Sequence, residues 1–502
     1  METASERGCE RVAGSFIRPE IDAGRGEQRP WQSRYFFWLT ALFLLSLPFV
    51  NPWVRGDGVG YYAYVRALLI DHNLNFEQDW LHGNTSFVDG RVDPRGQILA
   101  SQYTSTGHLD NHFSAGPALL WAPFLAATHG IVIAADRLGW EIPADGFSRP
   151  YRIAMALGTA IYGFAGLLLA FDLTRQYFEE WWSFLATIAI WFASSFPVYM
   201  YFNPSWSHAH SAFAVSLFLW YWHRTRAKRG RAQWALLGLI AGLMIDVYYL
   251  NAAFLLVLAP EAVAAYGKIF SAAENRARRI LLSLEKQGLF ATVMVFMLGL
   301  TLITRRIIYG NAFESGYPPL STWFWTSPKI FQVLFSADHG MLTWTPVLAL
   351  ALAGLVMFAR IDWLFGSGLL LAFLVFFYCI ASYVNWDGLS SFGNRFFVSF
   401  TPVFVIGLAA LLEGVARRWS VRPAAIVCAV TLLVLWNFGF IFQWGTQMIP
   451  RQGAISWDEV VHNQFAVVPQ RVAGGLHSYF ADRGMLIREI EKREMQRNHQ
   501  QK

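Results

Sequence analysis

The stretch Arg55-Gly56-Asp57-Gly58-Val59-Gly60-Tyr61-Tyr62-Ala63-Tyr64-Val65-Arg66 follows the first long apolar run and opens a polar loop that continues to about residue 111. Glycine has no Cβ, so the glycines around Asp57 let the backbone turn tightly and approach a ligand closely. From Tyr61 to Ile70 the apolar residues recur at helical spacing, which predicts a short helix lying in the membrane interface. A second interpretation is that Asp57 only caps this helix, since Asp is a favoured N-cap residue. In either case the stretch places a carboxylate just outside a membrane span.

The composition places most of the chain in a membrane. Of its 502 residues, 55% are hydrophobic and 15% are charged, whereas soluble domains carry about 25% charged residues. The apolar residues gather in runs of about 15 to 24, the length at which an α-helix crosses about 30 Å of hydrocarbon. Such runs must be helical, because a backbone in lipid has to satisfy its own hydrogen bonds. We therefore expect an all-α polytopic membrane protein.

Charge and cysteine usage exclude several classes of function. The net charge of +6 lies mostly in short loops, which indicates topology and contact with the lipid bilayer rather than nucleic-acid binding. The three cysteines, Cys9, Cys379 and Cys428, show neither a pairing pattern nor metal-ligand spacing. We expect no nucleic-acid partner and no metal site built from these residues.

Basic clusters set the expected topology. Those at 224–231, 268–286 and 417–422 are expected in the cytoplasm together with the tail 1–34. An even number of crossings must then separate the tail from the first cluster, so one apolar run does not span; we expect this to be 116–135, which contains prolines. About eleven spans remain, with the C-terminus outside. They are expected at residues 35–50, 153–172, 183–199, 209–222, 234–247, 249–263, 289–308, 341–359, 363–382, 396–413 and 424–442.

The topology predicts three parts: a cytoplasmic tail, 1–34, a transmembrane domain, 35–442, and a small extramembrane segment, 443–502, on the outer face. It also gathers the polar, motif-like loops on that outer face, where function is usually carried. These loops are 51–152, which contains the interfacial helices, 309–340 and 384–395. We therefore expect one active site built from loops far apart in the sequence.

Candidate site residues on this face are Asp57, Asp110, His112, His208, His339, Asp387 and Arg395. Taken singly, they could be turn residues, or side chains that reach from a helix end to the lipid head groups. His208 and His210 are two positions apart and do not share a helix face, which argues against a metal-binding pair. Taken together, they suit transfer of a group from a lipid phosphate. A carboxylate takes a proton from an acceptor hydroxyl, and an arginine holds the phosphate and stabilises it as it leaves.

Four segments carry a resemblance to a known family. They are Gly56-Asp57-Gly58-Val59-Gly60-Tyr61-Tyr62-Ala63-Tyr64, residues 113–124, Ser336-Ala337-Asp338-His339-Gly340-Met341-Leu342 and Ser391-Phe392-Gly393-Asn394-Arg395-Phe396. They resemble bacterial membrane glycosyltransferases of the GT-C fold, and are similar to the protein O-mannosyltransferases and the aminoarabinose transferases of lipid A. The resemblance covers most of residues 35–415 in order and is at the level of the fold, with a few local motifs.

The resemblance implies a polyprenyl-phosphate sugar as donor and transfer at the outer, periplasmic face of a bacterial inner membrane. In it, Asp57 takes the position of the family's first-loop acid, and Arg395 that of an arginine near the lipid phosphate. The segment 111–117 takes the position that reads acidic-Lys-Pro-Pro in related enzymes, with His112 in place of the lysine. Gly58 stands where a second acid commonly follows the first. That second acid comes from elsewhere, such as Asp110, or is absent, which leaves dependence on a divalent metal and the sugar open.

The expectation is an inverting glycosyltransferase with Asp57 as general base towards an acceptor hydroxyl of a glycan, lipid or protein. Arg395 with His112 or His339 would clamp the phosphate, and the other candidates would contact substrate. Trp323, Trp325 and Trp386 would line sugar or isoprenoid surfaces. Two rivals stay open: a transporter or flippase of lipid-linked sugars, and an inactive scaffold in envelope assembly. Against transport, the sequence has no inverted repeat and few ionisable residues at mid-membrane depth.

Overall fold

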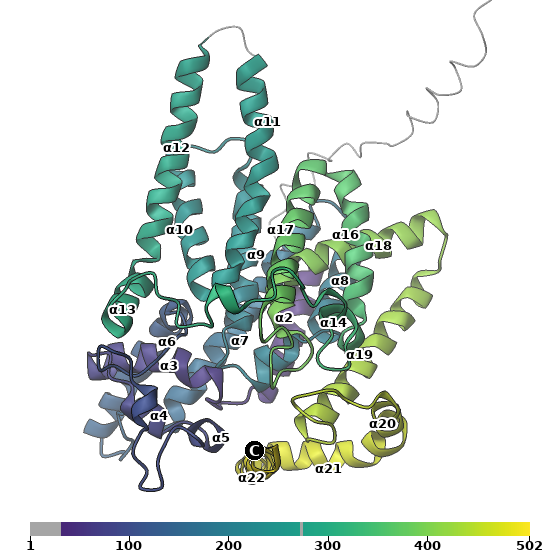
Figure 1. The fold of residues 1–502 in the computed structure, drawn as a ribbon. Coiled ribbons are helices and arrows are strands. Elements are labelled where there is room, and N and C mark those ends of the chain that lie inside the picture. The colour runs from purple at the N-terminus through teal and green to yellow at the C-terminus, as the bar shows by residue number, and fades with distance from the viewer. Residues whose placement is uncertain (1–31, 272–274, 502) are drawn as a thin grey trace, which may run out of the picture.

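The computed structural model describes residues 32–271 and 275–501, and the regular secondary structure in these ranges is helical, with two isolated β-bridges and no strand (Figure 1). The expected all-α membrane fold is confirmed. Most of the expected tail 1–34, with Cys9, lies outside the described residues. The long helices are α2 (Arg34–Ser46), α6 (Gly116–Arg137), α7 (Arg149–Thr174), α8 (Glu180–Phe192), α9 (His208–Thr225), α10 (Arg231–Val247), α11 (Leu258–Ser271), α12 (Arg276–Met297), α13 (Gly299–Tyr309), α16 (Val347–Ile361), α17 (Trp363–Ser382), α18 (Thr401–Arg418) and α19 (Pro423–Gly445).

Shorter helices build the loops and the C-terminal segment. The first polar loop contains α3 (Asp57–Arg66), α4 (Glu77–Leu81) and α5 (Thr85–Val88), and a later loop contains α14 (Ile330–Phe335) and α15 (Met341–Trp344). Short helical turns, η6 (Tyr249–Val257) and η8 (Arg395–Phe400), precede α11 and α18. The chain ends in α20 (Trp457–His462), α21 (Val468–Ala481) and α22 (Arg483–Gln501), which lie at the same end of the molecule as α4 and α5 (Figure 1).

Small residues let the long helices of the bundle pack closely. A Cβ added at Gly354 of α16 would come within 1.8 Å of the Gly407 carbonyl oxygen of α18, and a Cβ at Gly407 would come within 2.1 Å of the Ala351 carbonyl oxygen. Between helices in lipid, where apolar burial gives little driving force, such backbone contact is a main source of association. These glycines fix α18 in the bundle, and α18 follows directly on the turn η8 that carries Arg395.

Seven helical segments in the described ranges are long and apolar enough to cross a bilayer: Gly116–Arg137, Arg149–Thr174, Tyr249–Ser271, Arg276–Met297, Trp363–Ser382, Arg395–Arg418 and Pro423–Gly445. Two shorter apolar segments, Arg34–Phe49 and Val347–Ile361, fall at expected spans. The run 116–135 is one continuous helix of span length, α6, with Pro123 inside it. Its prolines therefore do not break the helix, and the parity of the basic loops is the remaining argument against its crossing the membrane. The total of about eleven spans stays a prediction.

One expected loop is helical instead. The basic cluster 268–286 was expected to be a cytoplasmic linker, but α11 and α12 extend through most of it and project from the bundle as a hairpin (Figure 1). Lysine and arginine are good helix formers, and Arg231 at the start of α10 makes an ion pair of 2.7 Å with Glu285 of α12. The charges of this cluster therefore decorate a helix rather than a loop.

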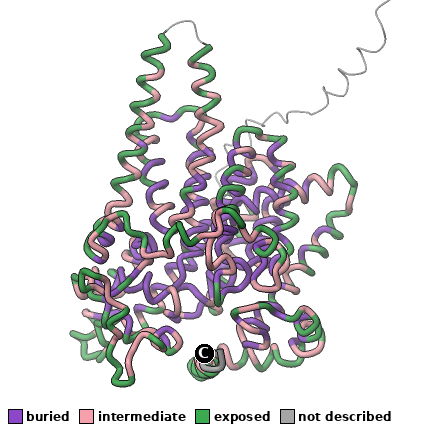
Figure 2. The backbone as a smooth tube through the Cα atoms, in the orientation of Figure 1, coloured by how far each residue is buried: buried purple, intermediate pink, exposed green. Residues whose placement is uncertain are grey.

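Burial is concentrated where the bundle meets the first loop (Figure 2). The hairpin of α11 and α12 is mostly exposed, including large apolar side chains such as Val263, Leu281 and Phe296. Apolar side chains exposed in this number on a helix are typical of surfaces that face lipid. The buried region around α3, by contrast, is where the polar candidate residues converge.

Candidate functional site

Asp57 is the first residue of α3 and is fixed there by the residues on either side. Gly56 has φ +51°, a left-handed conformation that favours glycine, and its N–H donates to Asn84 Oδ1 at 2.9 Å. A Cβ added at Gly58 would lie 2.0 Å from Ser205 Oγ, so only glycine lets α3 lie against the segment before α9. The N-cap of α3 is Gly56, and Asp57 therefore is not the capping residue.

The helix that begins at Asp57 is buried within the protein, whereas the sequence predicted a short helix lying in the membrane interface. Every residue from Gly58 to Arg66 is buried. The sequence pattern was misleading because the tyrosines of this segment make internal hydrogen bonds: the Tyr62 hydroxyl donates to the Gly146 carbonyl at 2.7 Å and the Tyr64 hydroxyl to the Asn111 carbonyl at 3.0 Å. The polar face is turned towards other parts of the protein instead of solvent.

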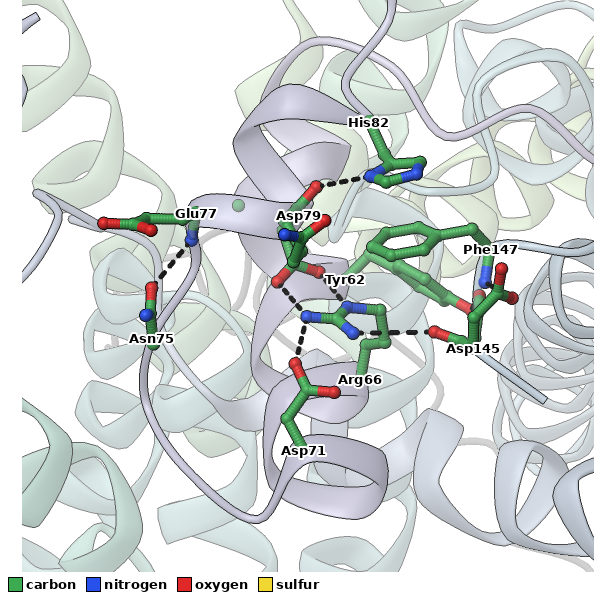
Figure 3. A network of polar contacts seen from close by, with 12 residues as sticks. Tyr62, Arg66, Asp71, Asn75, Glu77, Asp79, His82, Asp145 and Phe147 are labelled. Atoms are coloured by element: carbon green, nitrogen blue, oxygen red, sulfur yellow. Dashed lines mark hydrogen bonds and ion pairs between the residues drawn. The ribbon is translucent and has the colours of Figure 1, made fainter. Parts of the chain in front are cut away.

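A buried ionic network anchors the far end of α3 (Figure 3). Arg66 donates to both carboxylate oxygens of Asp79 at 2.6 and 2.7 Å and to Asp71 at 2.5 Å, and its guanidinium lies 4.4 Å from the centre of the Phe147 ring. A bidentate arginine–carboxylate pair is strong and geometrically specific. The network joins α3 to α4 and to the segment before α7, and so holds Asp57 in place from behind.

Arg395, which is far from Asp57 in the sequence, forms an ion pair with it. Arg395 Nη1 lies 2.8 Å from Asp57 Oδ2, and 34% of the Asp57 side chain but only 10% of the Arg395 side chain is exposed. The guanidinium also stacks 4.4 Å from the centre of the Trp206 ring, whose indole N–H donates to the Arg55 carbonyl at 2.9 Å. The arginine is thus held between a carboxylate and an aromatic ring, and the carboxylate is the more accessible partner of the ion pair.

The Asp57–Arg395 pair forms part of the wall of a cavity of about 1060 Å³. Much of the remaining wall is aromatic, which provides surfaces on which a sugar ring or an isoprenoid chain can pack. Among these aromatic residues are Tyr61, Trp206, Tyr248, Tyr249, Tyr317, Trp323 and Tyr383. The charged wall residues are Arg55, Asp57, Arg91, Arg395, Arg451 and Glu494. Four arginines against two carboxylates leave an excess of positive charge, which favours an anionic ligand.

Two further predicted residues, His112 and His208, line this cavity. Burial lowers the pKa of His112, and the nearby Asp57 and Asp110 carboxylates offset this only in part. His112 is therefore neutral at neutral pH and offers one N–H donor. Its position is fixed through its backbone, because Arg305 donates to its carbonyl oxygen at 2.5 Å. His208 lines the wall from the first residue of α9.

The structure does not bring Asp110, His339 and Asp387 into the cavity wall. Asp110 accepts a short hydrogen bond from the Tyr309 hydroxyl. The His339 side chain is fully buried and packs 4.6 Å from the Trp344 ring, so it cannot reach a phosphate in the cavity. Asp387 accepts from the Leu389 N–H at 3.1 Å within a turn, and it is the neighbouring residues of that turn that face the cavity. Each of the three lies beside the site in sequence, but its side chain is engaged in contacts within the protein outside the cavity wall.

The predicted tryptophans divide in the same way. Trp323 lines the cavity, and Trp325 stacks on it with ring centres 5.2 Å apart. Trp386 is half-buried against the apolar core, and its carbonyl accepts from Asn394 at 2.9 Å. Only Trp323 therefore presents a surface to a ligand.

Four charged wall residues were missed by reasoning from the sequence: Arg55, Arg91, Arg451 and Glu494. Arg91 is the most informative, because in the part of the chain that the structure describes its guanidinium contacts the Phe87 carbonyl and ring but has no carboxylate partner. Burial lowers the pKa of Arg91, although a guanidinium remains charged at neutral pH. The one feature of the sequence that could have indicated Arg91 is its position in the same loop as Asp57.

The donor atoms do not fit a bound divalent metal. Within residues 32–271 and 275–501, no three His, Cys, Asp or Glu side chains gather closely enough to hold one. The two carboxylates of the cavity wall, Asp57 and Glu494, are each ion-paired with arginine. Mg²⁺ and Ca²⁺ prefer a set of oxygen ligands, which this wall does not offer.

Comparisons with known protein families and with curated proteins find no match. Among solved structures, the chain is similar to the archaeal oligosaccharyltransferase AglB from Archaeoglobus fulgidus, in complex with an inhibitory peptide and a dolichol-phosphate. The identity is 15% and the TM-score is 0.45, and the match covers 92% of this chain and 56% of that chain. This chain thus spans a little over half the length of that neighbour.

Proposed function

We propose that this chain is an integral-membrane glycosyltransferase of the GT-C type that moves a sugar from a polyprenyl-phosphate donor to an acceptor hydroxyl. The site would work at the outer, periplasmic face of a bacterial inner membrane, with a glycan, lipid or protein as acceptor. The observation that carries the proposal is the Asp57–Arg395 pair in the wall of an aromatic cavity with excess positive charge. It combines a partly exposed base with cationic groups suited to a lipid-borne phosphate.

In the proposed reaction, the Asp57 carboxylate takes the proton of the acceptor hydroxyl. The hydroxyl oxygen then forms a bond to the anomeric carbon on the face opposite the phosphate, and the bond between that carbon and the phosphate oxygen breaks. The electron pair leaves with the polyprenyl phosphate, so the configuration is inverted. The phosphate leaves already ionised and needs no general acid, which agrees with the single carboxylate beside Arg395.

Arg395, Arg91 and the neutral His112 would hold the phosphate as negative charge develops on it. Arginine suits this role because its planar guanidinium offers paired N–H donors. Arg395 cannot give its full donor set to a phosphate while it is bound to Asp57. Binding of the donor is therefore expected to weaken that pair and to free the carboxylate for the acceptor.

The test is transfer from radiolabelled polyprenyl-phosphate sugars in membranes, with the wild type compared with Asp57→Asn. Asp93→Asn is the matched control, because Asp93 is a carboxylate of the same loop outside the cavity wall that accepts two backbone N–H bonds, which an asparagine oxygen can also accept. We expect label in a new product with wild type and Asp93→Asn only. Donor movement across the bilayer without any product would support a flippase and refute the transferase.

A further inference from the structure

The C-terminal segment returns to the cavity and places a carboxylate in its wall. Helix α22 packs against α5 of the first loop (Figure 1). Glu494 of α22 accepts from Arg55 Nη2 at 2.6 Å, makes a short ion pair with Arg451, and accepts from Ser86 Oγ at 3.2 Å. Only 13% of its side chain is exposed. A residue near the end of the chain thus closes the side of the cavity next to Asp57.

The interface that holds α22 to the first loop and to the segment after α19 is polar. Thr85 Oγ1 donates to Glu491 Oε2 at 3.0 Å, and Gln447 Nε2 donates to the Ile490 carbonyl at 3.2 Å. No residue between Arg483 and Gln496, the part of α22 whose side chains are described, is fully buried. Apart from the pairs made by Glu494, these contacts lie at the surface and contribute little each, so displacement of Glu494 would release the helix without loss of a hydrophobic core.

The chemistry around Glu494 is that of an anion site. Two guanidinium groups from distant parts of the chain converge on one carboxylate in the wall of a cavity with excess positive charge. Burial alone would raise the pKa of Glu494, but Arg55 and Arg451 outweigh it and hold the pKa below its usual range. Paired arginines are the arrangement that binds phosphate bidentately. The Glu494 carboxylate here occupies the position that a phosphate group would take.

We propose that Arg55 and Arg451 form a phosphate subsite. Glu494 occupies this subsite and so holds α22 over it as a lid, and a phosphate group that binds to the two arginines displaces the lid. The inference deepens the proposed function and rests on it for the source of that phosphate, the arriving donor or the departing polyprenyl phosphate. By linkage, if lid closure weakens phosphate binding by some factor, bound phosphate opens the lid by the same factor. While the site is empty, the lid keeps Arg55 and Arg451 paired with the Glu494 carboxylate.

The experiment uses the full chain in nanodiscs and follows trypsin cleavage of α22 by mass spectrometry, after Arg488, Lys492 and Arg493. The probes are farnesyl phosphate, for a lipid-borne phosphate, and inorganic phosphate, for a free one. We expect farnesyl phosphate to raise the cleavage rate of the wild type roughly tenfold, in the range usual for coupled sites. Glu494→Gln is expected to be cleaved rapidly without any probe and to bind farnesyl phosphate roughly tenfold more tightly.

Two further variants make the test specific. Glu489→Gln is the matched control, because Glu489 lies on the same helix, is exposed, and makes only a 3.8 Å contact with Arg493; it should behave as the wild type. Arg451→Gln should lose the response to the probe and bind it more weakly. A response to both probes shows that the phosphate group suffices, and a response to farnesyl phosphate alone shows that the lipid is required; both support the subsite.

The proposal is overturned if neither probe changes cleavage of the wild type, or if Glu494→Gln matches Glu489→Gln in cleavage and affinity. Neither readout depends on sugar transfer. A lid that opens on binding farnesyl phosphate in a protein that transfers no sugar would refute the proposed function and leave the subsite standing. Sugar transfer that depends on Asp57, together with α22 cleavage that neither probe changes, would support the proposed function and refute the subsite.

Discussion

Replacing Asp57 by asparagine tests both roles assigned to the Asp57–Arg395 pair, because the substitution keeps the shape of the side chain and removes its charge. Loss of a general base costs about 10²- to 10⁴-fold in rate, or about 3 to 5 kcal/mol of transition-state stabilisation. The effect on folding is small by comparison. Asp57 is one-third exposed, and pairs of that kind contribute about 1 kcal/mol or less, while Arg395 keeps its contact with the Trp206 ring.

The same substitution is expected to improve donor binding. Arg395 is 2.8 Å from the Asp57 carboxylate, so a donor phosphate has to compete with that carboxylate for the guanidinium. Removing a competing interaction of about 1 kcal/mol corresponds to about a fivefold lower KM for the donor. A fall in kcat together with a lower KM would separate this outcome from general damage to the site, which raises KM.

The assay is steady-state transfer from a labelled donor at saturating acceptor, with protein levels matched by immunoblot and Asp93→Asn as control. The reasoning is refuted if Asp57→Asn keeps more than about a tenth of the wild-type kcat, since a base is worth at least about a hundredfold. The prediction of tighter donor binding is refuted if the KM for the donor rises while the melting temperature is unchanged.

Three further variants address the surroundings of the pair. Asp79→Asn breaks the buried bidentate contact with Arg66 and should lower the free energy of unfolding by about 3 kcal/mol; an unchanged melting temperature in detergent would contradict this. Gly58→Ala places a Cβ 2.0 Å from Ser205 Oγ and should cost about 1 to 3 kcal/mol by overpacking, with loss of transfer; a stable, active variant would show that α3 can shift freely. Arg91→Gln should raise the donor KM about tenfold with a smaller effect on kcat, as loss of a contact made before the transition state; equal KM values would remove Arg91 from the phosphate site.

The sequence was sufficient for the fold class and for placing Asp57 and Arg395 on one face, but not for the contact between them. Apolar runs of span length can only be helices in lipid, so the helical architecture follows from composition. Asp57 and Arg395 were placed on one face by the topology, and the structure brings them together. The number of spans could not be obtained in this way, because two criteria disagree on α6. Its length and hydropathy suit a membrane span, whereas the parity of the basic loops excludes one.

Individual side chains were harder to predict, because one turn decides whether a residue faces a ligand or the protein. His339 lies in a polar motif, yet its backbone is left-handed, at φ +56°, and its ring packs into the core beside Trp344. Asp387 accepts a hydrogen bond within its own turn, and Asp110 accepts one from the distant Tyr309 hydroxyl, so neither side chain faces the cavity. A motif indicates where the backbone approaches the site, but the direction of each side chain depends on tertiary packing.

The C-terminal helix shows the limit of local patterns most clearly. In the sequence α22 is a charged helical run whose glutamates alternate with basic residues, a pattern typical of a solvated surface helix. Nothing within that run distinguishes Glu494 from Glu489. In the structure, Glu489 remains at the surface, whereas Glu494 pairs with Arg55 across 439 positions of the chain. Arg55 lies two residues before Asp57, so its partner Glu494 lies within the site. The sequence pattern assigns Glu494 to solvent, yet its negative charge affects which ligands the cavity can bind.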